Sequence, residues 1–317
     1  MAYTQKTTRV DPNKVITDMV IEAIESGEDA PWRKPWAATT TGINAMWAHN
    51  PVTKNVYRGI NPMILSMIAY KNGYSDTRWV TFKGAQTLNG TVRKGEKGTM
   101  VVFWKPLIVE DKDRKDENGN PAKKKIMMLK TYTVFNVEQC DNLDIKPWAE
   151  YIAPDPDAEP YDVLAAADEI IENYQHNLNG PTISHVGGDG AFYTPSLDTI
   201  SLPQRSDFKS QEGYYATVFH ECAHSTGHKS RLNRSMEAIN HFGDEAYSKE
   251  ELVAEFTAAF LCGHTGIVQE TIENHTAYLK SWIKALKNDS KLLVSAAGKA
   301  QAAYDYILGI KHEYSED

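Results

Sequence analysis

The stretch Phe219-His220-Glu221-Cys222-Ala223-His224 gives the strongest indication of the fold and chemistry of the second half of this 317-residue chain. It contains an H-E-x-x-H pattern and follows residues with helical periodicity. Positions four apart lie on one face of a helix, so the imidazoles of His220 and His224 can bind one metal ion. Glu221 can reach a water molecule on that ion. The stretch predicts a metallohydrolase site that holds Zn²⁺; the alternative is a helix that carries these residues by coincidence.

A third metal ligand is expected, because a catalytic zinc site has three protein ligands and one open position. His228 is a local candidate. In the pattern H-E-x-x-H-x-x-G-x-x-H, however, the third histidine would fall at Ser230, so the pattern fails there.

An acidic helix predicted over 248–260, with Ser248 as its N-cap, offers another candidate. Glu251 and Glu255 share one face of it, and two carboxylates on a buried face need a cation or a hydrogen-bond donor to offset their desolvation, a need that zinc would meet. We therefore expect Glu251 to bind the metal and Glu255 to hydrogen-bond a ligand imidazole. Glu250 lies about 100° around the helix and is expected to face solvent.

Three short segments before the metal helix, 182–186, 191–193 and 199–202, alternate as strands do. They predict a small sheet beside the zinc cleft. An edge strand there can pair with an extended peptide through main-chain hydrogen bonds, which favours a polypeptide substrate.

The charge of the chain divides at Cys140. Residues 1–140 hold 21 Lys and Arg against 14 Asp and Glu, whereas residues 141–317 hold 13 against 28. Because phosphate binding depends on local positive charge, we expect only the first half to contact a polyanion, unless the asymmetry is chance patchiness. The Pro- and Asp-rich stretch 141–160 is typical of a linker. The sequence thus predicts a domain over 1–140, a linker over 141–160 and a second domain over 161–317.

The first domain is predicted to be a small α+β fold. One helix begins after Asp11 and ends near Gly27, and a second begins at Asn61-Pro62 and ends before Gly73. Strands are predicted over 78–82, 100–104 and 127–135. The highly charged stretch 110–125 is predicted to be a mobile hairpin loop.

Aromatic and basic residues alternate in this half, a pattern typical of single-strand binding, in which rings stack on bases and cations follow phosphates. No helix resembles a duplex-reading recognition helix, so single-stranded nucleic acid is the preferred partner. Burial in the core is expected for the strand aromatics Trp79, Phe82, Phe103 and Phe135. The candidate contact residues are Trp32, Arg33, Lys34, Trp36, Tyr57, Arg58, Arg78, Arg93, Lys94 and Lys97.

Composition excludes several classes of protein. Hydrophobic residues make up 41% and charged residues 24% of the chain, as in ordinary globular proteins. No apolar run approaches the roughly 20 residues of a membrane span, and the N-terminus lacks a secretory leader. Three cysteines do not form a disulfide framework and are expected to be free thiols. We expect a cytoplasmic protein with no membrane partner.

Several motifs together resemble those of the ArdC antirestriction proteins of conjugative plasmids, over nearly the whole chain. In the first half they are Pro31-Trp32-Arg33-Lys34-Pro35-Trp36, Tyr57-Arg58-Gly59-Ile60-Asn61, Trp79-Val80-Thr81-Phe82-Lys83, Val92-Arg93-Lys94-Gly95-Glu96-Lys97-Gly98 and Val101-Val102-Phe103-Trp104. In the second half they are Asp198-Thr199-Ile200-Ser201-Leu202-Pro203, His220-Glu221-Cys222-Ala223-His224-Ser225-Thr226-Gly227-His228, Arg231-Leu232-Asn233-Arg234 and Glu250-Glu251-Leu252-Val253-Ala254-Glu255.

The resemblance implies an N-terminal module that binds single-stranded DNA and a zincin-like metallopeptidase module related to the SprT group. A third ligand at Glu251 departs from SprT proteins and is more like the gluzincin scheme. The implied role is protection of incoming plasmid DNA from host restriction, with a restriction protein or a DNA-bound protein as the peptidase substrate. Two alternatives remain: a non-catalytic protein that coats single strands around a structural or dispensable metal site, and a protease that cleaves DNA-bound proteins.

Overall fold

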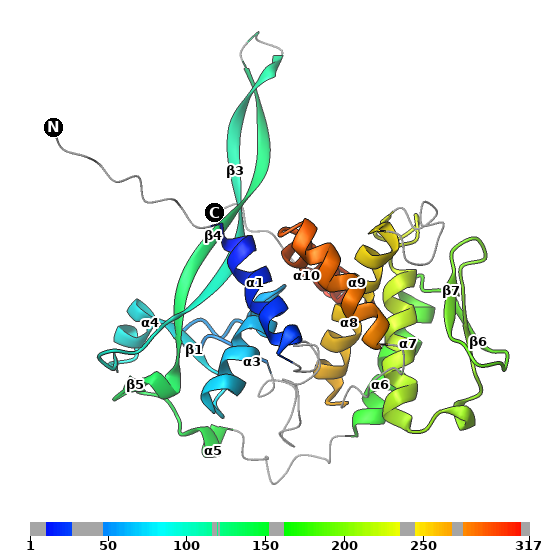
Figure 1. Cartoon of the computed structure of the whole chain (residues 1–317), viewed down its shortest axis with the longest axis horizontal. Coiled ribbons are helices and arrows are strands. Elements are labelled where there is room, and N and C mark those ends of the chain that lie inside the picture. Colours follow the sequence, from blue (N-terminus) through cyan, green and yellow to red (C-terminus); the bar gives the residue numbers. More distant parts are fainter. Residues whose placement is uncertain are drawn as a thin grey trace. The chain divides into compact units, whose positions relative to one another are not determined.

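The computed structural model describes residues 11–26, 47–115, 119, 121–151, 162–234, 245–267 and 275–311. Its contacts divide the chain into two compact units, and each is described by itself (Figure 1). Unit 1 takes its described residues from 1–48, 56–73 and 146–317, and unit 2 takes its residues from 49–55 and 74–145. Among the helices of the described residues, none is long and apolar enough to cross a membrane.

The two helices predicted in the first half are present, and both pack in unit 1. Helix α1 (Pro12–Glu25) begins at an N-cap, Asp11, and α3 (Asn61–Asn72) ends at Gly73, which adopts the left-handed region at φ 71°. The Thr17 hydroxyl of α1 donates to the Ser290 carbonyl oxygen at 2.9 Å. Unit 2 ends at Ile145, inside the predicted linker, and the domain division at 141–160 stays a prediction.

The core of unit 1 is formed by the later helices, among which α8 is central. Residues 250–263 of α8 are all buried, because α7 packs against one side of it and α10 against another. Helix α8 starts at Glu245, three residues before the predicted cap at Ser248. The helices of this part are α5 (Trp148–Tyr151), α6 (Val163–Asn177), α7 (Gln211–Ser225), α8 (Glu245–Thr265), α9 (His275–Asn288) and α10 (Leu292–Ile307), with a 3-10 turn at Arg205–Asp207.

The predicted small sheet lies beside the metal helix. Its strands are β6 (Thr182–His185), β7 (Phe192–Thr194) and β8 (Thr199–Leu202), in the order β6-β8-β7. Strand β8 is parallel to β6 and antiparallel to β7, and both β7 and β8 contact α7. The buried side chains of Ile200 and Leu202 hold β8 against the core.

Unit 2 is built on a three-stranded sheet in the order β1-β4-β3. Strands β3 and β4 pair along a ribbon that extends well beyond the rest of the sheet (Figure 1). The core lies at the base of this ribbon, around Val80, Ala85 and Val137. The elements of the unit are β1 (Trp79–Thr81), α4 (Phe82–Thr87), β2 (Thr91–Val92), β3 (Thr99–Lys115), β4 (Pro121–Asn136), a 3-10 turn at Val137–Gln139 and β5 (Cys140–Asp141), which pairs with β2.

The structure corrects two predictions for this unit. The stretch 110–125 is mostly strand, since β3 runs to Lys115 and β4 starts at Pro121; charged side chains do not end a ribbon that solvent reaches on both faces. Trp79 is buried as predicted, but Phe82 is 55% exposed and Phe103 is 41% exposed. Phe82 opens α4 instead of continuing β1, and Phe103 lies on the part of the ribbon beyond the core.

Candidate metal centre

Helix α7 presents the H-E-x-x-H residues on its buried side. The helix is capped by Ser210, whose hydroxyl accepts a hydrogen bond from the Gly213 N–H. His220 and His224 lie one turn apart, and their Nε2 atoms are 3.0 Å from each other. Both imidazoles and the neighbouring Glu221 are buried. The predicted pair of nitrogen ligands therefore faces a common point.

Helix α8 brings a carboxylate to the same point. Oε2 of Glu251 is 3.5 Å from Nε2 of His220, and Oε1 is 3.4 Å from Nε2 of His224. One ligand atom from each of the three residues lies within 4.8 Å of the others. The predicted ligands, which are 31 residues apart in the sequence at their extremes, are thus adjacent in space.

The donor set fits a divalent metal ion. In a tetrahedral zinc shell with metal–nitrogen distances of about 2.0–2.1 Å, two ligand atoms lie about 3.3 Å apart. The separations of 3.0, 3.4 and 3.5 Å measured here are close to that value. Two imidazoles and one carboxylate also leave a fourth position for water or substrate, as catalytic zinc sites do.

A carboxylate lies behind each imidazole. Glu255 Oε1 is 3.7 Å from Nδ1 of His220, on the side away from the metal position; this distance is longer than a hydrogen bond, so the hydrogen bond expected between the two stays a prediction. Glu250 Oε1 is 3.7 Å from Nδ1 of His224. The expectation that Glu250 faces solvent is wrong, because its side chain is only 8% exposed.

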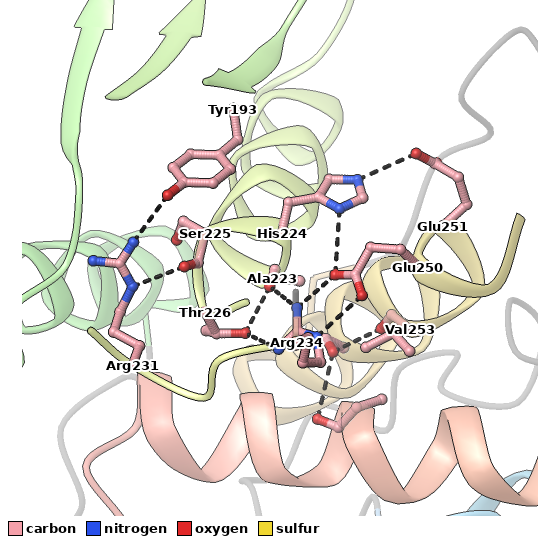
Figure 2. A network of polar contacts seen from close by, with 12 residues as sticks. Tyr193, Ala223, His224, Ser225, Thr226, Arg231, Arg234, Glu250, Glu251 and Val253 are labelled. Carbon is pink, nitrogen blue, oxygen red and sulfur yellow. Dashed lines mark hydrogen bonds and ion pairs between the residues drawn. The ribbon is translucent and has the colours of Figure 1, made fainter. Parts of the chain in front are cut away.

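Arg234 explains the burial of Glu250. Its guanidinium donates to Oε1 of Glu250 at 2.6 Å and to Oε2 at 3.1 Å, and so supplies the cation that a buried carboxylate needs (Figure 2). The same guanidinium donates to the Ala223 carbonyl oxygen and the Thr226 hydroxyl. Arg234 follows α7, so a helical projection of α8 alone could not have revealed this partner.

A second arginine of the same segment supports the end of α7. Arg231 donates to the Ser225 carbonyl oxygen at 2.7 Å and to the Tyr193 hydroxyl at 3.1 Å (Figure 2). It also forms an ion pair with Asp198. The last carbonyl groups of a helix have no partner within it and carry partial negative charge. The two arginines therefore stabilise the end of α7 that carries His224.

The electrostatics of the site favour positive charge. Burial lowers the pKa of His220 and of His224, but the carboxylates beside them outweigh burial, so both values are raised, that of His224 strongly. Burial raises the pKa of Glu251, and the two imidazoles lower it well below its usual range. A buried site in which carboxylates face two imidazoles in this way suits a bound cation.

Tyr214 of α7 contacts a histidine of the small sheet. The Tyr214 hydroxyl lies 3.2 Å from Nε2 of His185, and the two rings stack at 5.8 Å. No spacing in the sequence links His185 to Tyr214. The sequence could not have shown this pair because the two residues belong to β6 and α7.

The predicted DNA-contact residues fall into different environments. Trp32, Arg33, Lys34 and Trp36 lie outside the described residues. Tyr57 is buried, and Arg58 forms an ion pair with Asp305. Arg78 is buried and pairs with Asp76 at 2.6 Å. The burial of Tyr57 and Arg78 gives no support to a contact with DNA in this conformation, and these contacts stay predictions.

The remaining three candidates lie together on the surface of unit 2. Arg93, Lys94 and Lys97 are exposed in the turn between β2 and β3. Arg93 donates to Glu96 at 2.9 Å and to the Glu138 carbonyl oxygen at 2.6 Å. Their positions leave these cations accessible to a polyanion.

Family models match both halves of the chain. A model described as a zincin-like metallopeptidase matches residues 166–299. A model described as the N-terminal domain of anti-restriction factor ArdC matches residues 11–135. Their order along the chain agrees with the predicted mixed α+β architecture, in which the N-terminal domain precedes the zincin-like one.

Similar proteins cover nearly the whole chain. Two Escherichia coli proteins named DNA primase TraC are 37% and 36% identical over 96% and 95% of the chain, which spans only 20% and 27% of their lengths. The uncharacterized protein y4eC of Sinorhizobium fredii is 33% identical over 95% of this chain and 92% of its own length.

Crystal structures of the antirestriction ArdC protein from plasmid R388 are similar to this chain throughout. The metal-free structure has a TM-score of 0.70 and 36% identity, and covers 94% of this chain and 97% of that one. The Mn(II)-bound structure has a TM-score of 0.70 and 34% identity, and covers 96% of this chain and 100% of that one.

Proposed function

The chain belongs to the ArdC family of antirestriction proteins, and from that premise we propose that it protects incoming plasmid DNA by binding single strands and acting as a zinc-dependent peptidase. The observation that carries the peptidase assignment is the convergence of His220, His224 and Glu251 on one point, with Glu221 beside them. Compartment and partners follow from this role: a cytoplasmic protein that meets plasmid single strands during conjugation.

The residues of the centre have separate roles in peptide hydrolysis. His220, His224 and Glu251 would hold the metal, which when bound supplies Lewis-acid chemistry that makes water more acidic and polarises a carbonyl. Glu221 takes the proton from the attacking water and returns it to the leaving amine. Glu255 and Glu250 hold the two imidazoles in orientation through their Nδ1 sides.

Zinc is the proposed metal because two imidazoles and a carboxylate are its typical catalytic ligands. A related structure contains Mn(II), and nitrogen–oxygen donor sets accept several first-row metals. Metal analysis of the protein as purified, followed by removal with a chelator and reloading with zinc or manganese, tests the choice. A protein that regains hydrolysis with manganese alone would overturn zinc as the working metal.

Hydrolysis is tested with the Glu221→Gln variant, assayed on candidate restriction proteins and on proteins bound to single-stranded DNA. The variant should retain metal and lose cleavage. Cleavage that single strands stimulate would favour a protease for DNA-bound proteins, because tethering raises the local substrate concentration. Cleavage at the wild-type rate would remove Glu221 as the base.

A single-strand-coating protein whose metal site is dispensable is the second candidate. The exposed cations of unit 2, among them Arg93, Lys94 and Lys97, favour it, because phosphate contacts supply most sequence-independent affinity. A plasmid-transfer assay separates the two candidates. If Glu221→Gln still protects plasmid DNA while replacement of these cations abolishes protection, coating is sufficient.

A further inference from the structure

The ribbon of β3 and β4 carries aromatic side chains that the core does not use. Phe103 is 41% exposed, Tyr132 is 49% exposed and Trp104 is 50% exposed. Rings that are left in water on a strand cost hydrophobic free energy unless another molecule covers them. This surface therefore suits a ligand that stacks on rings.

The register of the ribbon divides these side chains between two faces. In an antiparallel pair, directly opposite residues point to the same face, and residues two apart along a strand share it. Val101 is opposite Tyr132, Phe103 is opposite Lys130, and Lys105 is opposite Met128. Phe103, Lys105, Lys130 and Tyr132 thus lie on one face, here called the Phe103 face. Trp104, opposite Leu129, lies on the other.

On the Phe103 face two rings and two cations adjoin one another. The ring centroids of Phe103 and Tyr132 are 5.4 Å apart in an edge-on arrangement. Lys130 is the direct cross-strand neighbour of Phe103, and Lys105 follows two residues along β3. Around Trp104 the neighbouring pairs on its face, Val102 with Thr131 and Pro106 with Met127, contain no cation.

The charge of the ribbon identifies the kind of occupant. Strand β4 contains four lysines and no acidic residue, and the part of β3 that lies opposite residues 125–132 contains Lys105 and no acidic residue. The acidic residues of β3 lie nearer the tip of the ribbon, where Asp111 pairs with Lys124. A surface that combines exposed rings with lysines matches single-stranded nucleic acid, whose unpaired bases stack and whose phosphates attract cations. Duplex DNA hides its base faces, so it would use the cations and leave the rings uncovered.

We propose that the Phe103 face is a stacking platform for single-stranded DNA, on which bases contact Phe103 and Tyr132 while Lys105 and Lys130 contact the flanking phosphates. This assignment rests on the proposed single-strand binding. It names a DNA-contact surface that is not among the contact residues predicted from the sequence. The four side chains of the Phe103 face lie outside the core, so replacing them should leave the metal centre of unit 1 intact.

The test measures binding of the full chain to a fluorescein-labelled oligothymidylate by anisotropy at several salt concentrations. Phe103→Leu and Tyr132→Leu should each weaken binding roughly 5- to 150-fold, the loss expected for one stacked base, with the salt dependence unchanged. Lys105→Gln and Lys130→Gln should each reduce the slope of log affinity against log salt by about 0.7. Thermal unfolding verifies that each variant is folded.

Matched controls come from the same ribbon and from unit 1. Trp104→Leu removes from the other face of the ribbon a ring that is at least as exposed, and Phe192→Leu removes an exposed ring from β7. Lys299→Gln removes an exposed cation of α10. All three should bind as the wild type does. If Trp104→Leu weakens binding as much as Phe103→Leu, the choice of face is overturned.

The remaining outcomes separate this proposal from the proposed function. A wild-type chain that does not bind the oligothymidylate overturns single-strand binding itself. If the wild type binds and the Phe103-face variants bind as tightly as the control variants, the platform is overturned and single-strand binding is not. If Phe103→Leu and Tyr132→Leu weaken binding to duplex DNA as much as binding to the oligothymidylate, the argument that these rings stack on unpaired bases is overturned. A second copy of this chain is the other molecule that could cover the Phe103 face, and sedimentation of the DNA-free chain tests for it. A wild-type dimer that dissociates in the Phe103→Leu variant would assign the face to a second copy and overturn the proposal.

Discussion

Arg234 and Glu250 form a buried, doubly hydrogen-bonded ion pair behind the metal centre, with N–O distances of 2.6 and 3.1 Å. Glu250 in turn faces Nδ1 of His224, so the pair links the segment after α7 to a metal ligand. A carboxylate placed there without its arginine would be an uncompensated charge in the interior. The pair therefore connects the stability of unit 1 to the orientation of its metal ligands.

Replacing Arg234 with Met should destabilise the protein and weaken metal binding together. Loss of one partner of a buried ion pair costs about 3–5 kcal/mol in the free energy of unfolding. Loss of a group that orients a ligand weakens metal affinity about 10- to 100-fold. Urea denaturation and a competitive metal titration measure the two effects. The control is Lys14→Met, which breaks the exposed pair with Asp18 and should leave both quantities unchanged.

Removal of the metal should lower thermal stability, because a ligand that binds only the folded state stabilises it. At a free metal concentration 100 times the dissociation constant, the gain is about 2.7 kcal/mol. Thermal unfolding with zinc and with a chelator should therefore give different midpoints for the wild type and the same midpoint for His220→Ala. The matched control is His228→Ala, since His228 contacts Ser230 and is not part of the three-ligand cluster. A His228→Ala variant that loses the metal-dependent shift would contradict the assignment of ligands.

Glu221→Gln should separate metal binding from hydrolysis. The amide keeps the size of the side chain but cannot take a proton from water, so peptide cleavage should fall by about 10²–10⁴-fold or more. The metal content should equal that of the wild type, because Glu221 is not among the converging ligands. Glu212→Gln, in the first turn of the same helix, controls for the loss of one charge on α7. Unequal metal content would show that Glu221 affects binding and not only proton transfer.

Asp198 should contribute stability that acid removes. Burial raises its pKa, but hydrogen bonds from Arg231 and Tyr193 lower the pKa further, below the ordinary value of 3.8. Because the folded-state pKa is below the unfolded-state value, the contribution is complete above about pH 4 and is lost as the pH falls through the folded-state pKa. The unfolding free energies of the wild type and Asp198→Asn, measured in urea from neutral pH downward, should differ most at neutral pH. A difference that does not shrink in acid would contradict this account.

The metal ligands could be predicted from sequence because their signal is local. His220 and His224 are one helical turn apart, and Glu251 lies in a helix whose paired carboxylates already called for a cation. Glu250 could not be placed correctly, because its environment depends on Arg234, which lies in another segment. Helical geometry gives the direction of a side chain, and only the packing of neighbouring elements determines what it contacts.

The first half shows the same limit. The caps and stops of α1 and α3 are local signals and were predicted, but the contacts that α1 and the segment before α3 make with the C-terminal helices are not local. Arg58 of the segment before α3 pairs with Asp305, and the Gly59 N–H donates to the Gln301 side chain at 2.9 Å. Phe103 was expected in the core because alternation shows that a strand has two faces, yet alternation cannot show where the strand leaves the core.

The membership of α1 and α3 in unit 1 has a consequence for synthesis on the ribosome. The contacts of Thr17 with Ser290 and of Arg58 with Asp305 cannot form until the second residue of each pair has been translated, more than 200 residues later. A nascent chain can complete unit 2 early, but it cannot close the helical core until α10 has emerged from the exit tunnel. We therefore expect the ability to bind metal to arise late in translation, and a fragment that starts after residue 160 to need the first two helices supplied in trans.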